Sequence, residues 1–159
     1  MKFHTGIGYD VHKLVRGRDC IIGGVKFDHT HGLLGHSDAD VLLHAVCDAL
    51  LGALALGDIG DHFPDRDPRY KNIDSRILLK KTYQMILDRG YVLNNLDTII
   101  VCEDPKIKPR RQEIISTLAE ILAADKTQIS VKATTEEHMG FTGRCEGIKA
   151  WAYVSIVEK

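Results

Sequence analysis

The segment GIKAWAYVSI, residues 147–156, alternates apolar and other side chains along its whole length. Successive side chains of a β-strand point to opposite sides, so the apolar members of this segment share one face: Ile148, Ala150, Ala152, Val154 and Ile156. The alternation predicts a strand with one buried face. A strand of this kind needs neighbouring strands and a covering layer, which the rest of the chain must provide.

Further strands and helices are expected on both sides of a Pro/Asp-rich loop at 62–68. The β-like stretches are 2–14, 96–102 and 129–134, with a hairpin at 20–27 that turns at Gly23-Gly24. The helical stretches are 41–57 after the capping residues 37–40, 74–89 with Gly90 as its stop, and 109–123. The order β-β-β-α-α-β-α-β-β predicts an α/β (α+β sandwich) fold, a mixed β-sheet with helices packed on one face.

Composition favours an ordinary globular protein. The 159 residues, 44% hydrophobic and 27% charged, fit one domain spanning 1–159. A net charge of −1 predicts no bulk attraction to nucleic acid or to an anionic membrane. No apolar run approaches the roughly 20 residues of a membrane span. Without a CxxC pair or a targeting segment, we expect a cytoplasmic protein whose four cysteines are reduced and mostly buried.

Asp10, His12 and His44 are candidate metal ligands. Asp10 and His12 lie two apart on an expected strand, so both side chains point to one face. His44 lies on the following helix, where Asp40 or Asp48 is placed to accept the N–H that does not face the metal. Two histidines and one carboxylate leave a fourth position open, as in catalytic zinc sites. The spacing alone is a weak signal, because a D-x-H pair often occurs by chance and a helix histidine is usually a half-buried surface residue.

Several longer motifs accompany this triad. They are Gly-Tyr-Asp-Val-His at 8–12, Gly-Leu-Leu-Gly-His-Ser-Asp-Ala-Asp-Val-Leu-Leu-His-Ala at 32–45, Leu-Gly-Asp-Ile-Gly at 56–60, Phe-Pro-Asp at 63–65, Lys-Ala-Thr-Thr-Glu-Glu at 132–137 and Gly-Phe-Thr-Gly-Arg at 140–144. In order and spacing, and over essentially the whole chain, they resemble the 2-C-methyl-D-erythritol 2,4-cyclodiphosphate synthases of the non-mevalonate (MEP) pathway of isoprene and terpenoid biosynthesis.

The resemblance implies a metal-dependent phosphorus–oxygen lyase. In that family the 2-phosphate of 4-diphosphocytidyl-2-C-methyl-D-erythritol 2-phosphate attacks the metal-held β-phosphate, and CMP leaves. Asp10, His12 and His44 match the zinc ligands, with one zinc per subunit. Glu137 matches the ligand of a bridging magnesium or manganese ion, with Glu136 as a rival acid. His36 and Thr135 match the residues that stabilise the transition state.

The resemblance also implies residues that bind the substrate. Those on the methylerythritol side match Ser37, Asp58, Ile59, Gly60, Phe63, Pro64, Asp65, Arg66 and Asp67. Those on the cytidine side match Cys102, Glu103, Asp104, Pro105, Lys106, Ile107, Lys108, Ala133 and Thr134, although Glu103 and Asp104 make this approach more acidic than the family pattern. The family is a homotrimer with active sites between subunits, and Phe141 and Arg144 match a region near the trimer axis, where a cavity can hold an isoprenoid phosphate.

Two other functions share some of these residues. A hydrolase that uses a zinc-bound hydroxide would have the same triad but would consume water and release inorganic phosphate. A non-catalytic isoprenoid-phosphate binding protein would use the axial cavity and would not need His36, Thr135 and Glu137. The products formed from the diphosphocytidyl substrate distinguish all three.

Overall fold

A computed structural model describes residues 2–159 and shows a mixed five-stranded sheet in the order β4-β1-β7-β5-β6. The strands are β1 (Phe3–Arg16), β4 (His31–Leu33), β5 (Tyr91–Val101), β6 (Ile129–Thr134) and β7 (Gly147–Glu158). β5 and β6 are parallel, and the other neighbouring pairs are antiparallel. β2 (Cys20–Ile22) and β3 (Val25–Phe27) form a separate hairpin. The predicted mixed α/β fold is therefore confirmed.

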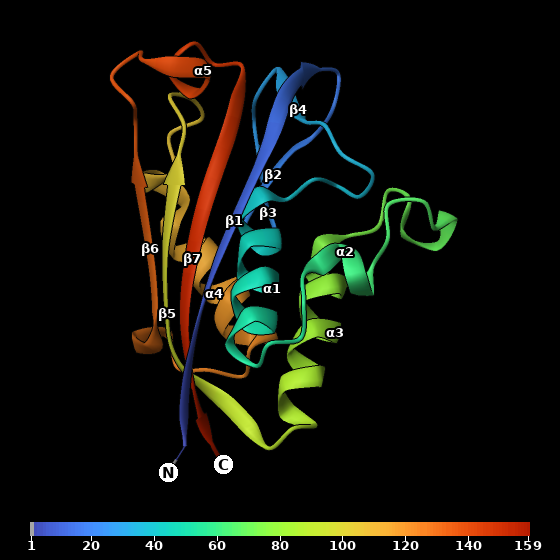
Figure 1. Cartoon of the computed structure of the whole chain (residues 1–159). Helices are drawn as coiled ribbons and strands as arrows, with labels where there is room; N and C mark the ends of the chain where they lie inside the picture. Colours follow the sequence, from blue (N-terminus) through green and yellow to red (C-terminus); the bar gives the residue numbers. More distant parts are fainter. Residues whose placement is uncertain (1) are drawn as a thin grey trace.

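The C-terminal segment occupies the middle of the sheet, as β7 between β1 and β5. Its alternating apolar residues are almost completely buried, with relative exposures of 0–1%: Ile148, Ala150, Ala152, Val154 and Ile156. Three helices cover this face (Figure 1): α1 (Val41–Ala53), α3 (Ser75–Leu87) and α4 (Arg111–Ile121). The core therefore lies between the sheet and one helical layer, as the sequence predicts.

α1 lies unusually close to β1, because two glycines leave room for its backbone. A Cβ atom added to Gly8 would lie 1.9 Å from the carbonyl oxygen of Ala45, and one added to Gly6 would lie 1.9 Å from that of Ala49. Any larger residue at either position would push the helix away from the strand. This close approach sets the distance between the α1 side chains and β1.

The termini of several elements differ from the predictions. α1 ends at Ala53 instead of near Gly57, and β5 begins at Tyr91 instead of Leu96. β5 is longer because its first half pairs with the end of β7, past a bulge at the polar residues Asn94 and Asn95. β4, α2 (Ile59–His62) and α5 (Gly140–Gly143) were not predicted, because three or four residues contain too little of a structural period to be recognised.

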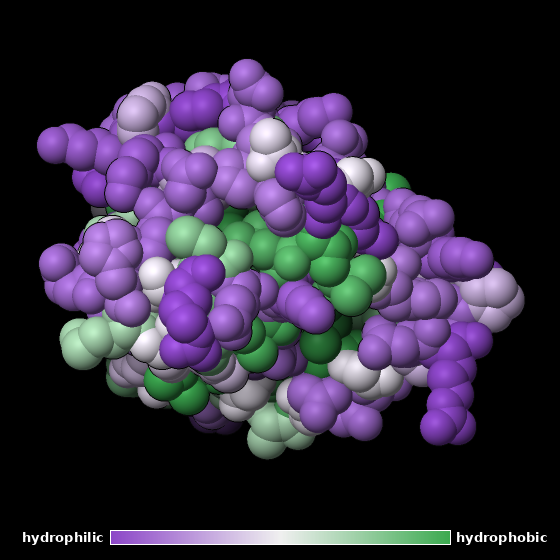
Figure 2. Space-filling view, turned by 90° about the horizontal axis from the view of Figure 1, so that it is seen from above, coloured by the Kyte–Doolittle hydropathy of each residue, from purple (hydrophilic) through white to green (hydrophobic). Residues whose placement is uncertain are grey.

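No helix of residues 2–159 covers the second face of the sheet (Figure 1). This face exposes apolar side chains. Ile7, Tyr9 and Val11 of β1 are 40–69% exposed, and Tyr153 of β7, opposite Ile7, is 49% exposed. Seen from above, at the end where β5 and β6 finish, the molecule is mostly hydrophilic around a central area of hydrophobic side chains (Figure 2). No helix among residues 2–159 has the length and apolar character required to cross a membrane.

Candidate metal centre and neighbouring pockets

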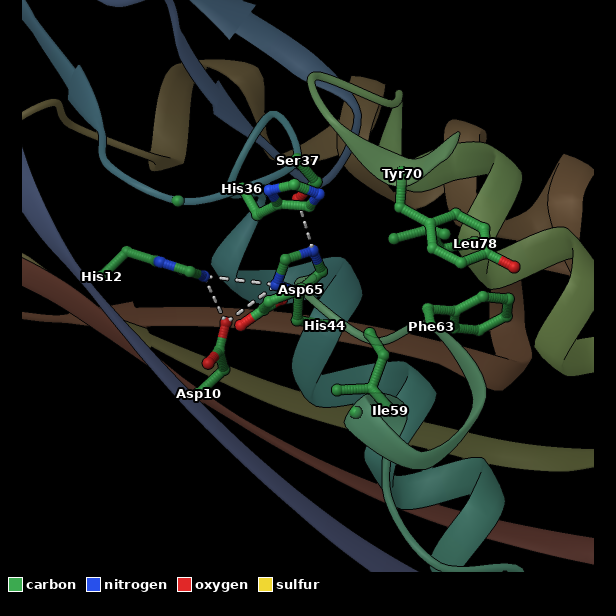
Figure 3. A pocket seen from close by; sticks show the side chains of 12 residues that line it. Asp10, His12, His36, Ser37, His44, Ile59, Phe63, Asp65, Tyr70 and Leu78 are labelled. Carbon is green, nitrogen blue, oxygen red and sulfur yellow. Dashed lines mark hydrogen bonds and ion pairs between the residues drawn. The ribbon is translucent and has the colours of Figure 1, made fainter. Parts of the chain in front are cut away.

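The structure brings Asp10, His12 and His44 together in the lining of a pocket (Figure 3). Asp10 and His12 project from the helix-covered face of β1, and His44 projects from the first turns of α1. Asp10 Oδ2 lies 2.8 Å from His12 Nε2 and 3.2 Å from His44 Nδ1. The two ring nitrogens are 3.2 Å apart. These three side chains thus offer ligand atoms to one common point, where they can hold a metal ion.

The hydrogen bonds behind the triad define which ring nitrogens carry protons when the imidazoles are neutral. His12 Nδ1 lies 2.9 Å from the carbonyl oxygen of Leu34, which can only accept, so Nδ1 donates and Nε2 keeps its lone pair. His44 Nε2 lies 2.9 Å from the Ser75 hydroxyl. That hydroxyl donates to Asp38, so it accepts the His44 Nε2–H and leaves Nδ1 bare.

Two bare imidazole nitrogens and a carboxylate oxygen fit a divalent metal ion. Nothing but a cation or a shared proton relieves the repulsion between lone pairs at these separations. Burial raises the pKa of Asp10, but hydrogen bonds and charges from His12 and His44 outweigh it and hold that pKa below its usual value. Burial lowers the pKa of His12, but the hydrogen bond and charge of Asp10 outweigh it, and the pKa is raised. The triad is therefore strongly coupled electrostatically.

The prediction that Asp40 or Asp48 orients His44 is wrong. Asp40 caps α1 at Leu43 N and also accepts from the backbone N–H groups of Gly23 and Gly24, at 2.8 and 2.6 Å. Burial raises the pKa of Asp40 to about 6, and the charge of Asp38 adds to this effect. Asp48 instead accepts from Ile59 N at 2.8 Å. Both carboxylates hold neighbouring loops against α1, and Ser75 takes the role expected of them.

The pocket beside the triad contains part of the expected methylerythritol set. Ser37, Ile59, Gly60, Phe63 and Asp65 line it, and so does His36, which the resemblance assigns to the transition state. Asp58, Pro64, Arg66 and Asp67 do not: Asp58 caps α2 at Asp61 N, and Asp67 forms an ion pair with Arg69. Gly35, Tyr70 and Leu78 also line the pocket and were not predicted, since nothing in their local sequence distinguishes them from loop and core residues.

A second pocket lies at the carboxyl ends of the parallel strands β5 and β6. Most of the expected cytidine set lines it, namely Cys102, Pro105, Lys106, Ile107, Lys108, Ala133 and Thr134, together with Thr135 and the unpredicted Arg111. Glu103 and Asp104 do not line it. Asp104 instead pairs with His29 at 2.8 Å, and the buried Glu103 side chain bonds to backbone N–H groups. Three cationic side chains at this pocket suit an anionic ligand.

Within one chain the two pockets stay apart, and His36 and Thr135 do not meet. The pockets have no lining residue in common. Asp10 pairs with Ala150, Ala150 with Ile100, and Ile100 with Ala133, so three interstrand steps separate the triad from the second pocket. At about 4.8 Å a step, this is roughly 14 Å.

The remaining predicted residues lie outside both pockets. Glu137 is exposed and bonds to the Thr135 hydroxyl at 3.2 Å, whereas its rival Glu136 is engaged by Lys149 at 2.6 Å and by Thr142. Arg144 pairs with Glu146 at 2.8 Å, and Phe141 lies under the Lys149 ammonium, 5.4 Å from the ring centre. Glu137 is thus the acid left free of a cationic side-chain partner.

A model of the YgbB family matches residues 3–157, nearly the full length of the chain. The chain belongs to the YgbB family. It is 58% identical over 155 residues to the 2-C-methyl-D-erythritol 2,4-cyclodiphosphate synthase of Acinetobacter baumannii (strain SDF), covering 98% of this chain and 97% of that protein. The resemblance seen in the sequence is therefore confirmed, and with it membership of a family of cyclodiphosphate synthases.

Solved structures of the family share this fold. The bifunctional IspDF from Campylobacter jejuni superposes with a TM-score of 0.95 at 41% identity, covering 99% of this chain and 43% of that longer chain. The Plasmodium falciparum IspF CDP complex superposes with a TM-score of 0.87 at 33% identity, covering 99% of this chain and 97% of that chain. A member of the fold thus binds a cytidine diphosphate.

Proposed function

We propose that this protein converts 4-diphosphocytidyl-2-C-methyl-D-erythritol 2-phosphate into 2-C-methyl-D-erythritol 2,4-cyclodiphosphate and CMP. The observation that carries the proposal is the convergence of Asp10 Oδ2, His12 Nε2 and His44 Nδ1 within 3.2 Å, in the lining of a pocket, in a chain of this family. In the reaction, an oxygen of the 2-phosphate bonds to the β-phosphorus. The bond from that phosphorus to the CMP oxygen breaks, and CMP leaves with the electron pair.

The protein supplies position and charge complementarity, and no side chain acts as nucleophile. When bound by Asp10, His12 and His44, zinc supplies Lewis-acid stabilisation of the β-phosphate. Glu137 would hold a magnesium or manganese ion, which would supply positive charge to the substrate phosphates. His36 and Thr135 donate hydrogen bonds to the phosphate oxygens as charge develops on them. His36 lines the metal pocket and Thr135 the second one, which agrees with a substrate that spans both.

The two pockets divide the substrate between them. Ser37, Ile59, Gly60, Phe63 and Asp65 enclose the methylerythritol portion, and the Asp65 carboxylate accepts from its hydroxyls. Cys102 and residues 105–108, with Ala133 and Thr134, hold CMP, and Lys106 is a phosphate contact. Asp58, Pro64, Arg66 and Asp67 shape the loop that closes over the methylerythritol side.

We further propose that the active site forms between subunits of a homotrimer. Two pockets roughly 14 Å apart in one chain become complementary halves if neighbouring chains each supply one of them. The helix-free, apolar face of the sheet is a suitable contact surface. Phe141 and Arg144 then lie near the axis, where an isoprenoid phosphate binds. We place the enzyme in the cytoplasm. Light scattering after gel filtration should give three times the 17.7 kDa chain mass.

Phosphorus NMR of the diphosphocytidyl substrate incubated with the protein, zinc and magnesium tests the reaction. Stoichiometric CMP and a cyclic diphosphate are expected, without inorganic phosphate. Free phosphate would instead indicate the hydrolase, and binding without turnover would indicate a binding protein. Asp10→Asn or a chelator should abolish product formation; turnover that survives both would refute the role of the metal.

A further inference from the structure

Glu103 links the two segments that form the second pocket. Its side chain is 9% exposed, although it lies beside the pocket and not in its lining. A single carboxylate oxygen, Oε1, accepts from the backbone N–H of Glu136 at 3.1 Å and from that of His138 at 3.2 Å. Glu103 thus fastens residues 136–138 to the segment 102–108, across 33 and 35 positions of the chain.

The fastened segment has a backbone that needs support. Glu137 and His138 are consecutive non-glycine residues with positive φ angles, 51° and 63°. Each such residue costs free energy, so the conformation persists only when the surroundings hold it. The Thr135 hydroxyl accepts from Glu137 N at 3.3 Å, but that bond lies within the segment. The Glu136 side chain bonds to Lys149 and Thr142, whereas the bonds to Glu103 hold the backbone N–H groups of this bend to the segment 102–108.

The bend resembles an anion-binding nest whose anion is a side chain of the protein itself. N–H groups that converge from a left-handed bend favour a negatively charged oxygen. Within the described residues, no lysine or arginine forms an ion pair with Glu103: the Lys106 ammonium bonds to its backbone carbonyl at 2.7 Å, and His138 Nδ1 lies 3.8 Å from Oε2. A buried carboxylate needs hydrogen-bond donors, and here the bend provides them.

We propose that Glu103 is a positioning residue that sets Thr135 and Glu137 against the nucleotide segment 102–108. The proposal rests on the proposed function for its catalytic consequence. Glu103 does not touch the substrate. It keeps the two residues that meet the diphosphate in register with those that meet the nucleotide, and it does so through the backbone on either side of Glu137.

Amide hydrogen exchange tests the position directly, without reference to activity. In Glu103→Ala, the amides of residues 136 and 138 lose their acceptor and should exchange roughly tenfold faster or more. Glu103→Gln keeps a carbonyl oxygen there and should restore most of the protection. Glu120→Ala, which removes an exposed glutamate from α4, is the matched control and should behave as the wild type. If Glu103→Ala does not fold, Glu103→Asp replaces it in the experiment. Its side chain is one methylene shorter, so the carboxylate oxygens lie further from the amides of residues 136 and 138.

Magnesium dependence tests the catalytic consequence. Glu103→Ala should need roughly tenfold more magnesium for half-maximal turnover, with zinc content unchanged, and Glu103→Gln should lie close to the wild type. Wild-type exchange or wild-type magnesium dependence in Glu103→Ala overturns the inference, and so does a Gln variant as impaired as the Ala variant. If the wild type itself forms no cyclic diphosphate, the proposed function fails, whereas the exchange data still decide whether Glu103 holds the bend.

Discussion

His12 Nε2 lies 3.2 Å from His44 Nδ1, although 32 residues separate the two histidines in the chain. Both nitrogens have lone pairs, because the opposite ring nitrogens carry the protons and donate them in hydrogen bonds to the Leu34 carbonyl and the Ser75 hydroxyl. Two lone pairs that face each other beside the Asp10 carboxylate form a candidate site for a cation. The orientation of the rings is therefore as much a part of the candidate site as the ligands themselves.

Removal of the His44 imidazole should abolish metal binding and leave the fold formed. His44→Ala loses one of three ligands, so zinc content should fall to near zero and product formation with it. Elemental analysis and far-UV circular dichroism measure the two effects. His4→Ala, which removes an imidazole from β1, the strand that carries Asp10 and His12, but six residues before Asp10, should keep its zinc. Unchanged zinc in His44→Ala would refute the ligand assignment.

Removal of the Ser75 hydroxyl should weaken metal binding without touching a ligand. In Ser75→Ala, the His44 Nε2–H loses its nearest acceptor, and the ring is less firmly oriented. The dissociation constant for zinc, measured by competition with a chelator, should rise by about tenfold or more. Ser116→Ala, whose hydroxyl bonds to its own helix, serves as control. Equal affinities in the two variants would show that the Ser75 hydroxyl does not matter for the metal.

Substitutions at Glu137 and Glu136 should separate the two rival ligands of the second cation. Glu137→Gln should raise the magnesium concentration needed for turnover and retain zinc. Glu136→Gln should affect magnesium less, because that carboxylate is already engaged by Lys149 and Thr142. Magnesium titrations with zinc analysis measure both effects. Loss of zinc from Glu137→Gln would show that the ligand sets are assigned incorrectly.

The native protein should present one reactive thiol per chain. Burial raises the pKa values of Cys20, Cys47 and Cys102 to about 12, so these groups stay neutral thiols well above pH 8 and cannot be reached by a reagent. Cys145 is exposed. Iodoacetamide at pH 8, followed by intact-mass spectrometry, should add one group to the native chain and four after denaturation. Rapid modification of a second thiol in the native state would contradict the buried environments.

Much of this architecture is visible in local sequence. The alternation at 147–156 predicts the strand β7 and its buried face correctly, and Asp40 and Asp74 mark the starts of α1 and α3. The sequence also predicts the candidate metal triad, from a D-x-H pair on a strand, a histidine on the next helix and the longer motifs that accompany them. These features depend on side-chain periodicity and on capping, which act over a few residues.

Contacts between distant segments are not encoded in this local way. Asp40 and His44 are neighbours on a helix, yet His44 bonds to Ser75, which lies 31 residues further along. Glu103 was expected to contact the nucleotide, yet its carboxylate is turned toward the backbone of residues 136 and 138. Which partner a polar side chain meets depends on how closely the elements pack. Here, Gly6 and Gly8 allow the backbone of α1 to pack directly against β1. That packing brings the ligand atoms of Asp10, His12 and His44 to a common point.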